Sequence, residues 1–125
     1  MHVVPITEAP AYEAPGHMQM AMQRLQGMEA GPSGSVWIGC SLLEPGGGTT
    51  LAGSDLEKFY ICLEGVVQVT AVADGHRQET HLHPLDSCRI APGEARQLFN
   101  PGTTAARLLL VMPQRTSTPP QETSP

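Results

Sequence analysis

The stretch GGGTTLAGSDLEKFYICLEG, residues 46–65, carries the pattern that decides the fold. Glycines stand at both ends, and the alternating aromatic, β-branched and small residues of FYICLEG predict that the chain passes from a loop into a strand. Ala52, Ser54 and Lys58 have the spacing of three metal ligands on one face of that strand. None of these residue types is a usual metal ligand, so the stretch has the frame of a metal site without the residues that bind a metal.

Strand and turn signals repeat along the rest of the chain. The 125 residues include 13 glycines and 12 prolines, which favours many turns and short strands, and the length suits one domain. Asp74-Gly75 predicts a hairpin, and a Pro-Gly turn is expected to close a strand that runs from about Ser35 to Leu43. The spacing of these signals, about 8 to 12 residues, is typical of a β-sandwich or barrel. We therefore predict an all-β fold, with further strands on both sides of Gly65 and over residues 76–83, 87–93 and 95–113, the last divided near Asn100.

Three parts of the chain are expected to differ in structure. Residues 1–34 form an N-terminal arm or strand that packs on a barrel, residues 35–113 form the barrel, and residues 114–125 form a disordered polar tail rich in Pro, Ser and Thr.

The methionine-rich residues 17–28 allow two interpretations. Helical spacing links Met18, Met22 and Leu25, whereas strand alternation places Met18, Met20 and Met22 on one face. We favour the strand, with the methionines filling the core.

The charge and the cysteines exclude several classes of protein. The net charge is −5 and the 7 basic residues form no cluster, so we expect neither nucleic acid nor an anionic membrane as a partner. The N-terminus has no basic segment followed by an apolar one, and no apolar run is long enough to span a membrane, so we expect a soluble cytoplasmic protein. Cys40, Cys62 and Cys88 lie in apolar stretches and form no Cys-x-x-Cys pair, which predicts reduced thiols in the core.

Two segments of the chain resemble the cupin motifs. Residues 46–65 are similar to the first motif, in which His-x-His, a glutamate and a final glycine follow an opening glycine. The sequence LDSCRIAPGEARQLFN, which begins at Leu85, is similar to the second: Gly93 and Asn100 stand in their expected places, but Leu85 replaces a glycine and the proline is moved by one position to Pro92. The resemblance implies a small antiparallel jelly-roll β-barrel.

The resemblance also implies where a metal would bind. Cupins commonly hold Fe, Mn, Ni or Zn through three histidines and one glutamate, and the matching positions in this sequence are Ala52, Ser54, Lys58 and Arg96. Alanine has no donor atom, serine alone is a weak ligand, and the cationic lysine and arginine repel a metal ion. We therefore expect the barrel without a metal and without another cofactor.

The histidines do not replace the missing ligands. His81 and His83 are spaced to share one strand face, but Leu82 between them is expected to fill the barrel, which sends both imidazoles outward. His17 is left open, because N-terminal arms in the family often fold over the barrel mouth.

Lys58 and Arg96 suggest an anion site in place of the metal site. Alternation places Lys58, Tyr60 and Cys62 on the inward face, and Arg96 arrives from the facing sheet. Two buried cations are costly unless they have a protein carboxylate, a lowered lysine pKa or an anionic ligand to compensate. We hypothesise that Arg96 clamps a carboxylate, phosphate or enolate, and that Lys58 acts as an acid or base or forms a Schiff base. Ser54 and Tyr60 would be hydrogen-bond partners in this site, whereas in the alternative interpretation Lys58 reaches the barrel mouth or pairs with a glutamate and the barrel is only structural.

Three functions remain open from the sequence. The first is a metal-independent isomerase, lyase or decarboxylase for a small carbonyl or carboxylate compound, and the second is a non-catalytic binder of a small organic anion. The third is a metal-dependent oxygenase or isomerase with unusual ligands, such as His17.

We also predict a homodimer, since FYICLEGVVQV has apolar residues on both faces. We expect Trp37 in the core or at the dimer contact.

Overall fold

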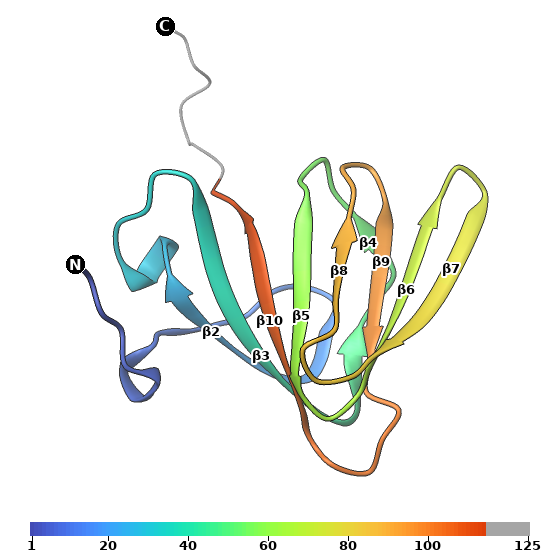
Figure 1. The fold of residues 1–125 in the computed structure, drawn as a ribbon, viewed down its shortest axis with the longest axis horizontal. Coiled ribbons are helices and arrows are strands. Elements are labelled where there is room, and N and C mark those ends of the chain that lie inside the picture. Colours follow the sequence, from blue (N-terminus) through green and yellow to red (C-terminus); the bar gives the residue numbers. More distant parts are fainter. Residues whose placement is uncertain (115–125) are drawn as a thin grey trace, which may run out of the picture.

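Antiparallel strands make up almost all of the structure, a computed structural model that describes residues 1–114 (Figure 1). The strands curl into a nearly closed barrel with jelly-roll character, which confirms the predicted fold class. Residues 115–125 of the predicted tail lie outside the described residues. The described elements are the 3₁₀ turns η1 (Ile6–Glu8) and η2 (Met28–Ala30) and the strands β1 (Ala11–Tyr12), β2 (His17–Gln26), β3 (Val36–Thr49), β4 (Ala52–Gly53), β5 (Lys58–Glu64), β6 (Val67–Ala73), β7 (His76–Leu82), β8 (Ser87–Ile90), β9 (Ala95–Phe99) and β10 (Ala106–Pro113).

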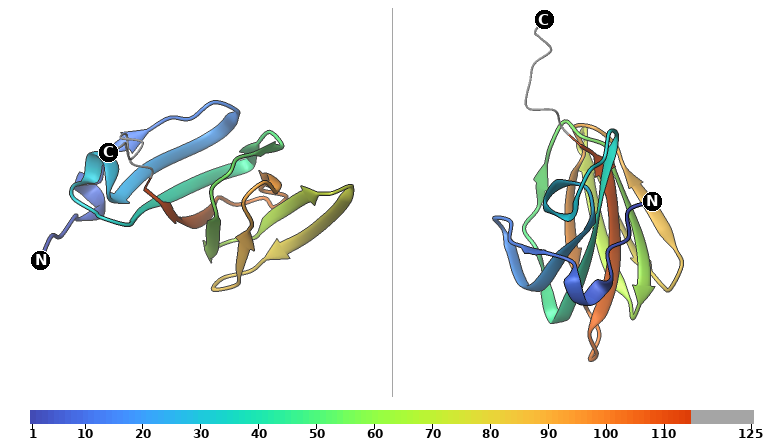
Figure 2. Two further views of the ribbon diagram at one scale, coloured as in Figure 1. Left: turned by 90° about the horizontal axis from the view of Figure 1, so that it is seen from above. Right: turned by 90° about the vertical axis from the view of Figure 1, so that its left-hand side faces the viewer.

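The strand order explains how distant segments meet in the barrel. Along the sheet the order is β7-β6-β9-β3-β10-β5-β8, with β2 also on β3, β1 on β2 and β4 on β9. Strands β5 and β6 flank Gly65 as predicted, but they do not pair: β5 pairs with β10 and β8, and β6 with β7 and β9. The two strands therefore belong to different parts of the curled sheet, seen from two further directions in Figure 2.

The hairpin predicted at Asp74-Gly75 is confirmed. Asp74 and Gly75 have φ angles of 52° and 77°, and they join β6 and β7 in a continuous antiparallel register. Positive φ angles at both central residues are typical of a type I′ turn, whose twist matches that of the two flanking strands.

The turn predicted after Leu43 is wrong, because β3 continues through Pro45 and the three glycines to Thr49. Gly48 pairs with Met18 on one side and with Phe99 on the other. A Cβ at Gly48 would lie 2.1 Å from the carbonyl oxygen of Leu98. Gly48 thus permits close approach of the backbones. The Pro-Gly segment before it forms a bulge, because Gly46 has a φ of 81° and the register on β2 moves from Leu43 opposite Met20 to Gly48 opposite Met18.

The strand interpretation of the methionine-rich segment is confirmed by β2, although its expected single face is not. Met22 is buried, whereas Met18 is 54% exposed. The register of β2 on β3 shifts between Met18 and Met20, and Gln19 between them has a φ of 53°. This irregularity takes Met18 off the face that Met22 occupies.

Inward side chains of β3, β5, β6 and β10 form the core together with residues of β7, β8 and β9. Asn100, which stands at the asparagine position of the second motif, is also buried: its Nδ2 donates to the carbonyl oxygens of Leu43 and Thr104, and its Oδ1 accepts from the Gly102 amide. This side chain holds the loop between β9 and β10 to the end of the barrel. The core is lined by Leu43, Tyr60, Cys62, Val67, Val69, Leu82, Ile90, Leu98, Ala106 and Leu108.

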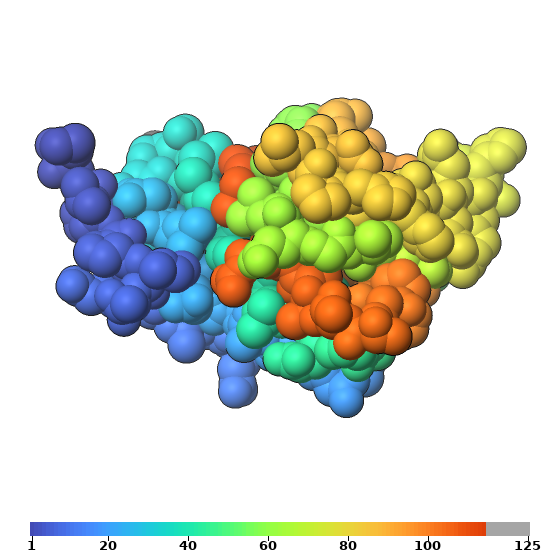
Figure 3. Space-filling view, turned by 60° about the horizontal axis from the view of Figure 1, so that its bottom comes forward, coloured from blue at the N-terminus to red at the C-terminus, as the bar shows by residue number. Residues whose placement is uncertain are grey.

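The N-terminal segment lies against one side of the barrel, and the β6–β7 hairpin lies at the opposite end (Figure 3). Strands β1 and β2 attach this segment to β3. No helix among the described residues is long and apolar enough to cross a membrane.

Candidate functional site

Lys58 and Arg96 lie in the barrel interior, as alternation along their strands predicts. Lys58 opens β5 and Arg96 lies in β9, and their exposed fractions are only 7% and 9%. Tyr60 and Cys62 follow Lys58 on the same inward face and are buried. Lys58 is also the only lysine in the sequence.

Arg96 is held by two neutral oxygen atoms. Its Nε donates to Tyr60 Oη at 2.8 Å, and its Nη1 donates to Thr49 Oγ1 at 3.3 Å. Thr49 also accepts from the backbone amide of Leu98, at 3.0 Å. Thr49 carries no signal in the sequence, because the Pro-Gly turn predicted after Leu43 would end the strand before it. These contacts fix the guanidinium without neutralising it.

Lys58 is held by Ser54. Its Nζ donates to Ser54 Oγ at 2.8 Å, and the same oxygen accepts from the amide of Leu56 at 3.2 Å. Burial lowers the pKa of Lys58, and the positive charge of Arg96 lowers it further, while Asp55 acts in the opposite direction. Lys58 is therefore easier to deprotonate than an ordinary surface lysine.

Tyr60 stays uncharged, and Glu57 and Glu94 have partners other than Lys58. Burial raises the pKa of Tyr60, although Arg96 partly opposes the shift, so its phenol remains protonated at neutral pH. Glu57 forms an ion pair with Arg89. Glu94 accepts a hydrogen bond from the backbone amide of Ala91 at 2.9 Å. Neither of these two glutamates thus serves as a partner of Lys58.

Lys58 and Arg96 line a common cavity of about 210 Å³. Ser54 and Tyr60 do not line it, and instead hydrogen-bond the two cations that do. His17, which the sequence left open, does reach this cavity, and its Nδ1 lies 2.9 Å from the carbonyl oxygen of Pro15. The other lining residues are Tyr12, Glu13, Ala14, Arg24, Trp37, Leu110 and Met112.

Sequence reasoning missed one wall of this cavity. The Cζ atom of Arg24 lies 3.5 Å from the ring centroid of Tyr12 and 4.2 Å from that of Trp37, and the two rings meet edge to face. Arg24 Nε also donates to Glu29 at 2.8 Å. Three strands bring these side chains together, so no local pattern could reveal the cluster. Trp37 is buried, as expected, but at the cavity.

The donor set at the four motif positions does not fit a metal ion. Ala52 is exposed, and Ser54, Lys58 and Arg96 supply one hydroxyl and two cationic groups. Within residues 1–114, no group of three or more His, Cys, Asp or Glu side chains is placed to hold a metal. His81 and His83 are exposed and Leu82 between them is buried, which confirms their expected placement.

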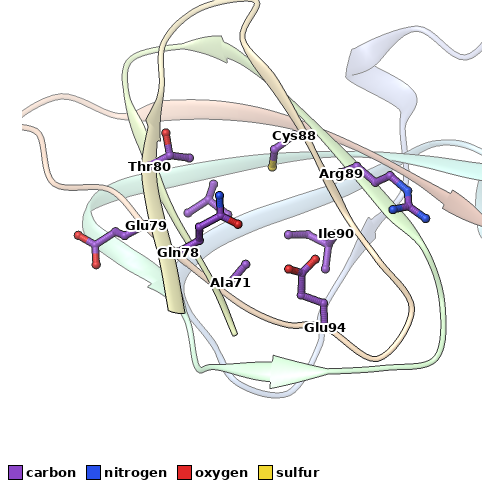
Figure 4. A pocket seen from close by; sticks show the side chains of 9 residues that line it. Ala71, Gln78, Glu79, Thr80, Cys88, Arg89, Ile90 and Glu94 are labelled. Carbon is purple, nitrogen blue, oxygen red and sulfur yellow. The ribbon is translucent and has the colours of Figure 1, made fainter. Parts of the chain in front are cut away.

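A second cavity, of about 190 Å³, lies on the side of β7 and β8 and contains none of the predicted site residues (Figure 4). Gln78 and Cys88 point into it, whereas Glu79 and Arg89 extend away from its centre. Burial and the carboxylate of Glu94 raise the pKa of Cys88 to about 11. The thiol is therefore protonated at neutral pH and poorly nucleophilic. Because this cavity thus lacks a reactive nucleophile at Cys88, the cavity lined by Lys58 and Arg96 is favoured as the functional site.

Comparison with known proteins finds close similarity in sequence and in fold. No family model matches the chain. It is 38% identical over 112 residues to a protein named beta-D-galactosidase Rv1717 from Mycobacterium tuberculosis, an alignment that covers 90% of this chain and 93% of the relative. The polyketide cyclase RemF from Streptomyces resistomycificus has a similar fold, with a TM-score of 0.75 and 22% identity over 90% of this chain and 79% of the other. A sugar phosphate isomerase of the cupin superfamily from Silicibacter pomeroyi gives a TM-score of 0.72 and 20% identity over 90% of this chain and 75% of the other.

Proposed function

This chain belongs to the cupin superfamily, and we propose that it binds a small organic anion, a carboxylate or a phosphate, in the cavity that Lys58 and Arg96 line. We further propose that any chemistry at this site is metal-independent and of the isomerase, lyase or decarboxylase class. The other cupin option, a metal enzyme with unusual ligands, is disfavoured by the donor set described above.

One observation carries this proposal: two cationic side chains are buried at positions that supply metal ligands in the cupin motifs. Lys58 and Arg96 line one cavity, and the pKa of Lys58 is lowered by burial and then by the charge of Arg96, against a smaller opposite effect of Asp55. The hydrogen-bond partners of both side chains are neutral hydroxyls. Burial of like charges is unfavourable, and an anion between them would relieve both the repulsion and the lost hydration.

The cavity walls suggest how such a ligand would lie. Arg96 would bind the anionic group through charge-assisted hydrogen bonds, with Tyr60 and Thr49 holding the guanidinium in place. Trp37, Leu110 and Met112 provide an apolar wall for the carbon skeleton. A volume of about 210 Å³ is below the roughly 300–1,000 Å³ of sites for drug-sized ligands, so the ligand is small.

Trp37 makes the proposal directly testable, because it is the only tryptophan in the sequence and it lines the cavity. Titration of the protein with acetate, benzoate, galacturonate and inorganic phosphate should change its fluorescence with at least one of them. The same anion should raise the melting temperature, since a ligand that binds only the folded state stabilises it. Lys58→Gln and Arg96→Gln should weaken both effects, whereas Arg77→Gln, at an exposed position in β7, should leave them unchanged. The proposal is wrong if no anion acts at millimolar concentration, or if the purified protein holds one equivalent of a metal in the barrel after chelation.

A second candidate function is hydrolysis of β-D-galactosides, which the name of the Mycobacterium tuberculosis relative favours. Glycosidases usually need two carboxylic acids beside the scissile bond. Among the described residues, Glu13 is the one acidic side chain that lines the cavity. A chromogenic β-D-galactoside should therefore be cleaved by the wild type and not by Glu13→Gln if this candidate holds, and should be left intact by both if it does not.

A further inference from the structure

The chain's only amine-bearing side chain lies in the candidate cavity. Lys58 is the sole lysine of the sequence, yet it is buried, with an exposed fraction of only 7%. Lysine is ordinarily among the most exposed residue types, and a long cationic side chain that serves only solubility would lie on the surface. The single lysine is instead placed next to a buried arginine and within 2.8 Å of a hydroxyl.

We propose that Lys58 forms an imine with the carbonyl carbon of a small 2-oxo or 3-oxo acid, whose carboxylate lies against Arg96. This inference rests on the proposed function, because it places the same anion in the same cavity. It adds the reactive group of the ligand and the covalent bond that Lys58 makes to it.

The neighbours of Lys58 support its role as a nucleophile. Only the neutral amine attacks a carbonyl, and lysines that form Schiff bases are activated by burial or by a neighbouring cation. Both are present here, since burial and the charge of Arg96 lower the pKa of Lys58, against a smaller opposite effect of Asp55. Ser54 Oγ, at 2.8 Å, accepts from the ammonium and can donate to the neutral amine, so it orients Nζ in both states.

The covalent step balances without a further reagent. The lone pair of Nζ forms the C–N bond as the C=O π bond breaks. The carbonyl oxygen takes one proton from the nitrogen and one from solvent and leaves as water. The product is an iminium that keeps the remaining nitrogen proton. Its positive charge faces the carboxylate of the same ligand, which compensates the charge that was costly in the empty cavity.

The arginine explains why an oxo acid is preferred to a simple ketone. Tyr60 and Thr49 hold Arg96 through Nε and Nη1, so the guanidinium is already oriented before a ligand enters. A carboxylate bound there brings the carbonyl carbon of the same small molecule to Lys58, which raises its effective concentration at the amine. Acetone lacks that group and should react much more slowly.

The test is reductive trapping. The wild-type protein is incubated with pyruvate, with acetoacetate or with acetone in the presence of cyanoborohydride, and the adduct is located by mass spectrometry of peptides. The only other amine of the sequence is the N-terminal α-amino group, so each adduct has two possible positions. We expect one adduct on Lys58, formed at least about tenfold faster with an oxo acid than with acetone, since a charge-assisted contact worth about 1.5–3 kcal/mol corresponds to that factor or more.

Matched variants and a competitor separate the possible outcomes. Lys58→Arg keeps the positive charge and cannot form an imine, so it should lose the adduct, and Arg96→Gln should slow its formation. Lactate, which has a carboxylate but no carbonyl, should compete with pyruvate. Trapping only at the N-terminus, while anions still change the Trp37 fluorescence, overturns the imine and leaves anion binding intact. Equal rates with acetone overturn the oxo-acid assignment, and loss of both trapping and the fluorescence response overturns the proposed function as well.

Discussion

Arg96 is the residue on which anion binding should depend most. Its guanidinium is buried and held by Tyr60 and Thr49, so truncation removes a pre-oriented donor rather than a mobile surface charge. Arg96→Ala should weaken binding of the best anion by about 2–5 kcal/mol, the range for truncation of one partner of a buried charge pair. Isothermal titration calorimetry measures this loss, and circular dichroism checks that the variant is folded.

The exposed histidines provide the control for that measurement. His81→Ala and His83→Ala should change anion affinity very little, because both side chains lie on the outer surface. If these variants lose binding while Arg96→Ala keeps it, the site has been assigned to the wrong face of the barrel.

Lys58 should make anion binding depend on pH. Burial, followed by the charge of Arg96, lowers its pKa in the free protein. A bound anion favours the ammonium, so the pKa of Lys58 is higher in the complex than in the free protein. Affinity should therefore be constant at low pH and should fall as pH rises from the free-protein pKa to the pKa of the complex. Titrations at a series of pH values test this, and Lys58→Met should remove the dependence; an affinity that rises over the same range contradicts it.

At the scale of the element, the end of β3 should tolerate no side chain at Gly48. A Cβ there would approach the Leu98 carbonyl oxygen to 2.1 Å, so Gly48→Ala must push β3 and β9 apart. Such overpacking costs about 1–3 kcal/mol, and we expect the free energy of unfolding to fall by that amount in urea denaturation. Gly34→Ala is the matched control, because a Cβ at Gly34 has no atom within 4 Å. An equal loss in the two variants would show that the close approach at Gly48 is not what limits the position.

At the scale of the whole molecule, we predict a homodimer formed through the outer face of the sheet. Val111 in β10 pairs with Ile38 of β3 and with Phe59 of β5, and Leu109 pairs with Ile61. Paired residues share a face of the sheet, and these side chains alternate with the inward residues of their strands. Phe59 is 40% exposed at this apolar patch, and two copies could bury it symmetrically.

Light scattering after size exclusion tests the dimer. Phe59→Asp places like charges opposite each other at a two-fold interface and should give a monomer. Leu85→Asp makes the same kind of change at a residue that is 80% exposed, in the loop between β7 and β8, and should leave the dimer intact. A wild-type protein that is monomeric at micromolar concentration rules the dimer out.

The sequence by itself determined the features that depend on local alternation. Period-two spacing placed Lys58, Tyr60 and Cys62 on one inward face, and it sent His81 and His83 outward around Leu82. These predictions hold because neighbouring side chains of a strand must point to opposite sides, wherever the strand lies in the sheet. The glycine positions of the two cupin-like motifs likewise predicted the jelly-roll barrel.

Only the tertiary structure decided which distant residues meet. Tyr60 and Thr49 come to Arg96 from β5 and β3, and the N-terminal segment brings His17 to the same cavity, because strand order and register set these contacts. Local signals cannot encode that order. In β3 the Pro-Gly segment bulges instead of ending the strand, because Leu43 before it and Gly48 after it both pair with β2. The inward direction of Lys58 was therefore readable from the sequence, but its partners and its cavity arose only when the sheet closed.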